Sequence, residues 1–401
     1  EFDPTDQIVA SGDAFCDSVE LSANSDYDSY EWKDNAGNVL STTKSFWINA
    51  SETVELDVSV IKSDGTTCDL ASGAVGITIN NTPQITLNNT GSTDYDGTNA
   101  ISLTASSSGS NTTYEWSTGA TTTAISVTSE GVYQVVGTEN GCSDSVAIKI
   151  YEPVYVAKTG DDTNGDGSLT SPYLTINKGV DMVSSGGKVY VLPGTYTETV
   201  DIDKSMSLQS DFVRLDSSSA ISSTKINGNG SICINISNEA SELDVYVEGF
   251  TLRNGSHTSN SSQGAINLQD SYSTSLYLAN SIIKESATTG DCCGRGGIIN
   301  VENAKYFQAD NVSIYDNGSE TQETRFPFNF NNVTSGIEIN NSKITDNGFT
   351  QWLFEVASSP LTIRNTVIAD NYSQWSDRDI FNVEYSNAAV TLEHVTIFGN
   401  D

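Results

Sequence analysis

The sequence predicts an all-β chain in which two β-sandwiches precede a parallel β-helix. Three observations predict this fold. Short alternating apolar and polar runs fill residues 1–151, one eight-residue pattern then recurs six times, and asparagine returns at a fixed place in that pattern. Alternation with a period of two is typical of strands that bury one face, and recurrence every roughly 20–50 residues is typical of stacked structural units.

Composition excludes several partners before any motif is considered. The 401 residues include 18 Lys plus Arg and 52 Asp plus Glu, which gives a formal net charge of −34. Nucleic acids and anionic membrane surfaces are bound by clustered basic residues, so neither is an expected partner. No apolar run reaches the ~18 residues of a membrane-spanning helix, so no membrane insertion is expected.

Several features predict an extracellular protein, either secreted or attached to the cell surface. The chain begins at Glu1 without an apolar leader, and we interpret it as a processed or trimmed segment of an exported protein. Asn-x-Ser/Thr triplets recur, as they do in glycoproteins, although many are expected by chance in so Asn-rich a chain. None of the six Cys forms a spaced pair suited to zinc.

Residues 1–151 contain two copies of one pattern. Val19–Ala23 corresponds to Ile101–Ala105, and the Tyr-Glu-Trp motif ending at Trp32 returns ending at Trp116. We expect one domain over residues 1–81 and a second over 82–151. The Tyr-Glu-Trp motifs and the segment Asn-Gly-Cys-Ser-Asp at 140–144 resemble the immunoglobulin-like and PKD-like modules of secreted surface proteins and adhesins of Bacteroidota-type bacteria.

This resemblance implies a disulfide between Cys16 and Cys68. The order Cys16, Trp32, Cys68 is that of an immunoglobulin-like sandwich, in which a central Trp packs on a disulfide between the sheets. In the second module Thr98 stands at the position of Cys16, so Cys142 has no partner in its own domain. Cys142, Cys233, Cys292 and Cys293 stay unassigned, and bridges between domains or between molecules are both open.

Residues 152–401 are predicted to form the β-helix. Six segments align without gaps, and positions 1, 3 and 8 of each are apolar almost throughout, so one face of each strand points inward. The six segments are 245–252, 276–283, 307–314, 337–344, 361–368 and 390–397. Their ends lie 31, 31, 30, 24 and 29 residues apart, which predicts stacked turns with variable loops.

The fifth position of these segments predicts an amide ladder. It holds Asn280, Asn311, Asn341 and Asn365, preceded by Gly249 and followed by His394. Asparagine tolerates left-handed backbone angles, so each Asn is expected at a tight bend, stacked at the ~4.8 Å strand spacing. A second column holds Asn317, Asn347, Asn371 and Asn400.

Such ladders resemble those of right-handed parallel β-helices. The segment 155–196 is similar to the cap of pectate-lyase-like β-helix proteins, which implies a short plugging helix over about residues 176–183. No matching cap pattern occurs near residue 401, so the solenoid is expected to be open or incomplete at that end.

A row of outward side chains is the candidate catalytic surface. Strand alternation places Asn267, Asn300, Asn329, Glu355 and Asn382 in one row, with Glu302 and Glu384 two residues further along. Two carboxylates one turn apart can act as acid and nucleophile on a glycosidic bond, so Glu355 with Glu384 or Glu302 is the predicted pair. The alternative is a solvated sheet face with stacked asparagines.

Calcium is the one cofactor that the sequence suggests. Asp162, Asn164 and Asp166 follow the spacing of the first half of a calcium loop, although Tyr173 replaces the glutamate of an EF-hand. Asp316, Asp346 and Asp370 form a second candidate, because carboxylates at turn spacing repel one another unless a cation screens them. An ordinary turn and solvated charges are the respective alternatives.

Trp352, Tyr372 and Trp375 are candidate ligand-binding aromatics, because exposed rings on adjacent turns can stack on sugars. Packing within the core or loops is the alternative. The leading functional hypothesis is an adhesive or structural protein of the cell surface, whose partners are other copies, surface proteins or glycans, and which can form a filament. The rival hypotheses are a β-helix polysaccharide lyase or glycoside hydrolase, and a non-catalytic glycan-binding module.

Overall fold

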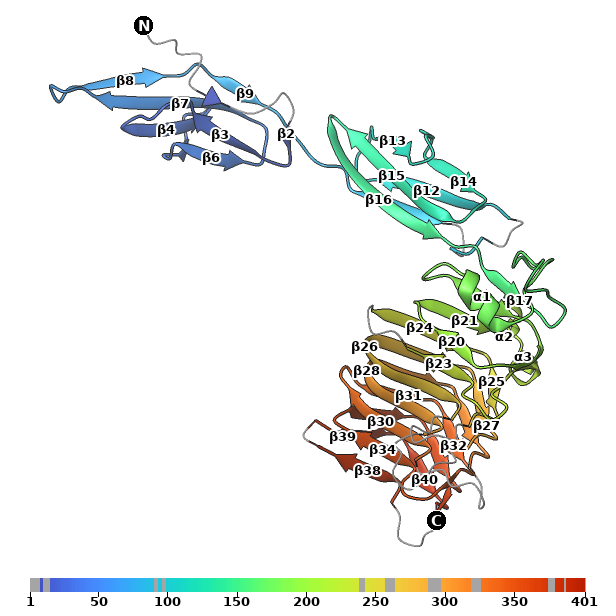
Figure 1. The fold of residues 1–401 in the computed structure, drawn as a ribbon. Coiled ribbons are helices and arrows are strands. Elements are labelled where there is room, and N and C mark those ends of the chain that lie inside the picture. Colours follow the sequence, from blue (N-terminus) through green and yellow to red (C-terminus); the bar gives the residue numbers. More distant parts are fainter. Residues whose placement is uncertain are drawn as a thin grey trace. The chain divides into compact units, whose positions relative to one another are not determined.

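A computed structural model describes the chain over residues 8–9, 15–89, 93–95, 99–237, 242–256, 264–287, 297–318, 326–373, 379–385 and 387–400 (Figure 1). Contacts divide it into two compact units, Glu1–Ile150 and Tyr151–Asp401. The predicted all-β fold with a β-solenoid is confirmed. Within the described ranges, no helix has the length and apolar character needed to cross a membrane.

The first unit begins with a sandwich of two antiparallel sheets around Trp32, which is fully buried with Leu21 and Leu56. One sheet contains β1 (Ile8–Val9), β3 (Val19–Ala23) and β6 (Ser45–Ile48). The other contains β5 (Val39–Ser41), β4 (Ser29–Asp34), β7 (Glu52–Ile61) and β8 (Thr67–Ala71), with β9 (Val75–Ile77) paired to β7. Strand β1 pairs with β3 of its own sandwich.

The second sandwich repeats this plan around Trp116. Its sheets are β11 (Ile85–Asn89), β12 (Ile101–Ser107) and β14 (Ala124–Val127), and β13 (Thr113–Trp116), β15 (Gly131–Glu139) and β16 (Cys142–Ile150). The repeat extends to hydrogen bonding. Trp32 Nε1 donates to the Thr43 carbonyl and Trp116 Nε1 to the Thr122 carbonyl, each at 2.8 Å, so both buried indoles are satisfied.

The predicted disulfide is wrong, because Cys16 is bonded to Cys142 and Cys68 is free. The short strand β2 (Phe15–Cys16) pairs in parallel with β10 (Ile79–Asn80), at the end of the first sandwich. The hairpin between β15 and β16 brings Cys142 to this point, where Asn80 Nδ2 donates to the Asn140 carbonyl at 3.0 Å. Cys16 is therefore bonded to the second sandwich through Cys142, whereas Cys68 lies on β8 opposite Val60.

In the second unit, successive turns stack as parallel strands in register (Figure 1). The first stack is β20 (Val200–Ile202), β23 (Ile234–Ile236), β26 (Ile266–Ala279), β28 (Ile299–Asp310), β30 (Phe328–Val333), β34 (Phe354–Ala357) and β38 (Phe381–Glu384). The second is β17 (Val154–Val156), β18 (Lys188–Val191), β21 (Met206–Ser210), β24 (Leu243–Glu248), then the far halves of β26 and β28, and β31 (Ile337–Asn340), β35 (Pro360–Arg364) and β39 (Ala389–Glu393).

A third stack completes each turn. It contains β19 (Gly194–Thr197), β22 (Thr224–Asn227), β25 (Thr251–Arg253), β27 (Ile282–Lys284), β29 (Ser313–Tyr315), β32 (Lys343–Thr345), β36 (Val367–Ala369) and β40 (Thr396–Phe398). The inward side chains of the three stacks form one continuous apolar core. Strands β33 (Gly348–Phe349) and β37 (Tyr372–Ser373) pair separately.

The bends between the second and third stacks have left-handed backbone angles. Asn280, Asn311, Asn341 and Asn365 have φ between 47° and 54°, and His394 continues the column at 55°. Asn311 Nδ2 donates to Asn280 Oδ1 at 2.7 Å and Asn365 Nδ2 to Asn341 Oδ1 at 3.3 Å, whereas Asn341 Nδ2 donates to Asp310. This exposed column is therefore interrupted between Asn311 and Asn341.

The second asparagine column forms a continuous buried ladder. Asn317, Asn347 and Asn371 are fully buried, and the Nδ2 of each donates to the Oδ1 of the next residue in the column, ending at Asn400, at 2.8–2.9 Å. Each Nδ2 also donates to two backbone carbonyls. These amides therefore satisfy backbone groups that the turn would otherwise leave buried and unpaired.

One end of the solenoid is closed by helix α1 (Ile176–Met182), whose Ile176 and Val180 are buried in the core. Asp162 accepts from the amides of Leu174 and Thr175, and Glu198 from those of Ile176 and Asn177, so the first turn is capped. Two further short helices, α2 (Asp211–Leu215) and α3 (Ser219–Ser223), lie between β21 and β22. In the last described turn the inward Val383, Leu392 and Ile397 are 40–45% exposed.

Candidate functional site

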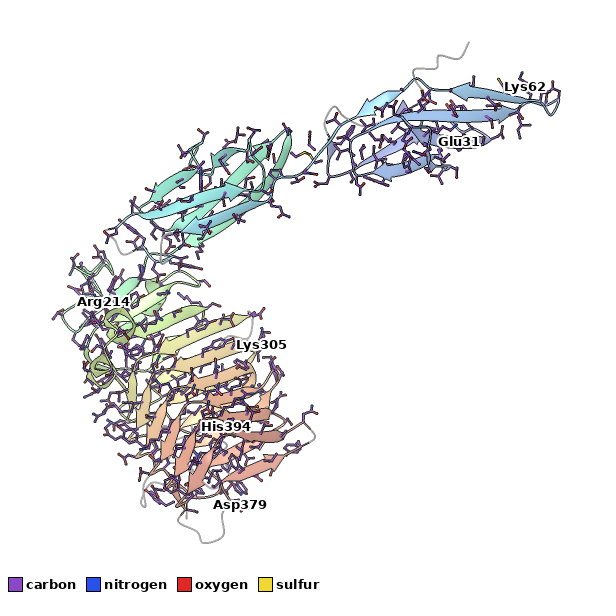
Figure 2. All side chains as sticks on the ribbon, turned by 180° about the vertical axis from the view of Figure 1, so that it is seen from behind. Glu31, Lys62, Arg214, Lys305, Asp379 and His394 are labelled. Carbon is purple, nitrogen blue, oxygen red and sulfur yellow. A yellow bond between two sulfur atoms is a disulfide. The ribbon has the colours of Figure 1, made fainter. Side chains whose placement is uncertain are left out.

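The structure brings Glu355 and Glu384 together on the first stack of the solenoid. Both glutamates are half-buried, and they lie on the face opposite the inward Phe354 and Val356. Asn382 Nδ2 donates to Glu355 Oε2 at 2.8 Å and to Glu384 Oε1 at 3.0 Å. Because both bonds end on one nitrogen, the two carboxylate oxygens lie within about 6 Å of each other. Two residues labelled in Figure 2 mark the last turns of the solenoid, where the pair lies: Asp379, just before β38, and His394, just after β39.

Strand register explains why Glu355 and Glu384 lie close together. Glu355 pairs with Asn382, and Ala357 pairs with Glu384, so the two glutamates are diagonal neighbours on adjacent strands. Asn382 and Glu384 are two residues apart, which places both on the same face as Glu355. An amide nitrogen has two hydrogens, and each is donated to one carboxylate. Asn382 therefore sets the spacing of the pair.

Glu355 interrupts a column of amides. Asn267 donates to Asn235 at 2.9 Å, Asn300 to Asn267 at 2.9 Å and Asn329 to Asn300 at 2.6 Å, each through Nδ2. Glu355 occupies the next position, opposite Asn329. A carboxylate accepts hydrogen bonds but cannot donate one while ionised, so it ends the donor chain. A residue that breaks a repeating structural pattern in this way indicates a functional position.

Glu302 is separate from this pair. It accepts from Asn331 Nδ2 at 3.0 Å, and its column runs through Asn331 and Ala357 to Glu384. Three strand spacings, roughly 14 Å, therefore separate Glu302 from Glu384. That distance is longer than the separation of paired catalytic carboxylates, so Glu302 does not pair with Glu384. Its strand lies two spacings, roughly 10 Å, from the strand of Glu355.

Of the predicted ligand-binding aromatics, the structure describes Trp352 and Tyr372, and both are half-buried. Trp352 stacks on Phe326 with ring centroids 5.6 Å apart and planes within 7°, and it is half-buried. Tyr372 is half-buried in β37, where its ring packs against Gly348. Trp375 lies outside the described residues. Of the three predicted aromatics, Trp352 is the nearest in sequence to the carboxylate pair, three residues before Glu355.

The side chains of the first candidate calcium loop are hydrogen-bonded within the cap. Asp162 accepts from the Leu174 and Thr175 amides and from the Thr175 hydroxyl, and Asn164 Nδ2 donates to Asp161 at 2.9 Å. The amide of Ser168 donates to Asp166 at 2.9 Å and holds the pKa of that carboxyl below its usual range. These side chains hold the turns that lead into α1.

The second candidate calcium column lies at exposed corners. Asp316, Asp346 and Asp370 have φ of 54–57°, in a column with Glu285 at 55°. Their side chains are exposed, and they occupy the left-handed position that asparagine or glycine takes elsewhere in the solenoid. Among the residues that the structure describes, no three His, Cys, Asp or Glu side chains are grouped so that they could hold a metal ion.

Sequence reasoning missed a row of tyrosines on the second stack. Tyr246 and Tyr277 stack with centroids 4.6 Å apart, and Tyr277 lies 5.6 Å from Tyr306. Burial, with a further contribution from Glu338, raises the pKa of Tyr306 to about 12. The signal was the second position of the aligned segments, which points outward and holds Tyr246 and Tyr277. Tyr246 and Tyr277 cover one face of each other and Tyr277 tilts against Tyr306, so this row stabilises the sheet, while Tyr246 stays 44% exposed.

Two open depressions lie on the sandwiches. One, of 480 Å³, lies over β4, β7 and β8 and is lined by Glu31, Asp57 and Asp69. Lys33 Nζ lies 2.7 Å from both Glu31 and Asp57, and these hydrogen bonds raise its pKa. The other, of 580 Å³, is lined mainly by threonines around Tyr114. Neither contains a pair of carboxylates without a neutralising cation.

No family model matches the chain, and no curated protein matches it. Solved structures match at low identity. A pectin methylesterase from Aspergillus niger is 14% identical over 62% of this chain and 84% of its own, with a TM-score of 0.32. A rhamnogalacturonan lyase is 13% identical over 62% of each chain, with a TM-score of 0.27. An amphioxus IgVJ-C2 molecule is 14% identical over 34% of this chain and 98% of its own, with a TM-score of 0.20.

Proposed function

We propose that the solenoid is a carbohydrate-active module that hydrolyses glycosidic bonds with Glu355 and Glu384. One observation carries the proposal, namely that both carboxylates hydrogen-bond the single nitrogen of Asn382. Glycosidases that retain anomeric configuration hold two carboxyl groups roughly 5–5.5 Å apart, whereas inverting ones need about 6.5–9.5 Å. The bound of about 6 Å between the two oxygens favours retention.

In this mechanism the carboxylate of one glutamate attacks the anomeric carbon. The other glutamate, in its protonated form, gives its proton to the departing oxygen. The second glutamate then takes a proton from water, which displaces the sugar from the first. Asn382 is a positioning residue, because it holds both carboxylates without contacting the sugar in either step. Lyase chemistry has less support, because the nearby Arg364 is already bonded to Glu393 at 2.8 Å and lies 3.4 Å from Glu338, on another stack.

The test is release of reducing ends from xylan, laminarin and polygalacturonate by the full chain. Glu355→Gln and Glu384→Gln should each abolish release, whereas Glu338→Gln, a glutamate on the second stack, should leave it unchanged. Azide added to the inactive Glu→Ala variants should restore turnover only in the variant that lacks the nucleophile. Turnover that survives both Gln substitutions would exclude the proposal.

An adhesive or structural role at the cell surface is the second candidate, and the covalent link between the two sandwiches favours it. Disulfides persist mainly in oxidising, extracellular compartments. On this hypothesis the solenoid binds glycans or other copies without turnover. Retention on insoluble xylan without product, reduced by Trp352→Ala, would support glycan binding, and fibres in images of the native material would support assembly.

A further inference from the structure

The disulfide encloses both sandwiches in one covalent loop. Cys16 precedes the core strands of the first sandwich and Cys142 begins the last strand of the second, 126 positions later. We propose that Cys16–Cys142 carries mechanical tension past both sandwiches, so that the first unit acts as an inextensible tether. Tension applied at the N-terminal side then reaches the second unit without passing through residues 17–141.

On the N-terminal side of the bond, the residues that the structure describes form only the short strands β1 and β2. Upstream of Cys16, the described pairing consists of β1 with β3 and of Phe15 with Ile79. Cys16 itself is held by the pairing of β2 with β10, and the neighbouring Asp17 accepts from the Thr82 amide at 2.8 Å. Within the described part of this segment, tension therefore detaches β1 and β2 before it loads the sulfur–sulfur bond.

On the C-terminal side of the bond, tension acts along β16, a strand that is already extended. Cys142 is the first residue of β16 and Ile150 is the last, and the second unit begins at Tyr151. A strand rises about 3.4 Å per residue, close to the maximum of about 3.3–3.6 Å for any chain. Pulling Cys142 away from Ile150 therefore gains almost no length, and all nine residues of β16 stay paired with β15.

Without the bond, the same tension has to open both cores. About 125 residues lie between Cys16 and Cys142, and fully extended they would span roughly 400–450 Å. The bond is also protected, because the Cys142 side chain is fully buried although Cys16 is exposed. Exchange requires a thiolate to reach a sulfur atom, so burial of one sulfur slows reduction.

The test is force spectroscopy on the full chain, held by an N-terminal tag and by a handle at Thr159→p-azidophenylalanine. Thr159 is exposed and lies nine residues past the end of β16. The oxidised chain should show no lengthening from the sandwiches. After reduction, the same chain should lengthen by roughly 400 Å in two steps, one for each core.

Cys16→Ser should behave like the reduced chain without any reductant, and Cys68→Ser, which removes a free thiol, should behave like the parent. If Cys16→Ser fails to fold, reduction of single parent molecules provides the same comparison. Lengthening of the oxidised chain by hundreds of ångströms would overturn the proposal. So would a reduced chain that resists the same force.

Discussion

Asn347 donates its side-chain amide to the side-chain oxygen of Asn371, 2.9 Å away, and both side chains are fully buried. Asn347 also donates to the carbonyls of Ile314 and Thr345 and accepts from the amide and side chain of Asn317. One side chain therefore satisfies groups on its own turn and on both neighbouring turns. Buried polar groups left without partners cost about 1–3 kcal/mol each.

We therefore expect Asn347→Ala to destabilise the solenoid by about 3 kcal/mol or more, because several buried groups lose a partner at once. Asn341→Gly is the matched control. Asn341 lies in the exposed column with φ of 51°, an angle that glycine adopts freely, so the change should cost under about 1 kcal/mol. Guanidinium unfolding followed by circular dichroism measures both, and equal midpoints would contradict the ladder's role.

The solenoid was predictable because its signal is repeated. The six segments place apolar residues at the same positions, and four of them place an asparagine at the same bend, so the copies agree on one register. The first asparagine column could not be predicted in detail, since Asn341 binds Asp310 instead of Asn311. Alternation alone does not determine which of two neighbouring oxygens an amide reaches.

The disulfide was not predictable from cysteine order. The order Cys16, Trp32, Cys68 fits a sandwich with a disulfide between its sheets, yet Trp32 packs its core without one. The observed bond depends on how the β15–β16 hairpin of the second sandwich approaches β2, a long-range contact that no local pattern encodes. In the candidate site, alternation predicted the face of Glu355 and Glu384. Alternation also placed Asn382 on this face, but its role as the shared donor was missed, although its position two residues before Glu384 was a usable signal.

Glu355→Asn should abolish activity and leave the fold as stable as the parent or more so. An Asn at this position can donate to Asn329 and accept from Asn382, which would continue the amide column that Glu355 interrupts. Functional residues commonly reduce stability in this way. Reducing-end release and guanidinium midpoints measured on one preparation would show both effects.

Glu302→Asn is the control for that change, because Glu302 already accepts from Asn331 and lies in a column without consecutive amides. It should leave activity intact and gain no stability. A marked loss of stability in Glu355→Asn would show that the glutamate belongs to the structural pattern, which would remove one argument for its catalytic role.

Cys142→Ser should lower the stability of the first unit. Removing a link that closes a loop of more than 100 residues releases chain entropy in the unfolded state, worth about 4–5 kcal/mol in the loop-closure model. Thermal unfolding of the full chain, with and without a reducing agent, measures the loss. The reductant should shift the parent and leave Cys142→Ser unchanged, and a non-reducing peptide map that joins Cys16 to any other cysteine would contradict the assignment.

The buried thiol of Cys233 should make the solenoid sensitive to alkali. Burial raises the pKa of this thiol from 9.0 to about 12, and its sulfur lies 3.3 Å from the Arg253 carbonyl. Below pH 9 the thiol is protonated in both folded and unfolded chains. Above pH 9 only the unfolded chain loses the proton, so the free energy of unfolding falls by up to about 1.4 kcal/mol for each pH unit until about pH 12.

Cys233→Ala isolates this contribution. It should lower the thermal midpoint below pH 9, because it leaves a small cavity, and its midpoint should fall less steeply above pH 9 than that of the parent. Tyrosines with raised pKa values, such as Tyr306, titrate in both proteins and cancel in the comparison. Parallel midpoint curves for parent and variant would show that Cys233 does not control the alkaline loss of stability.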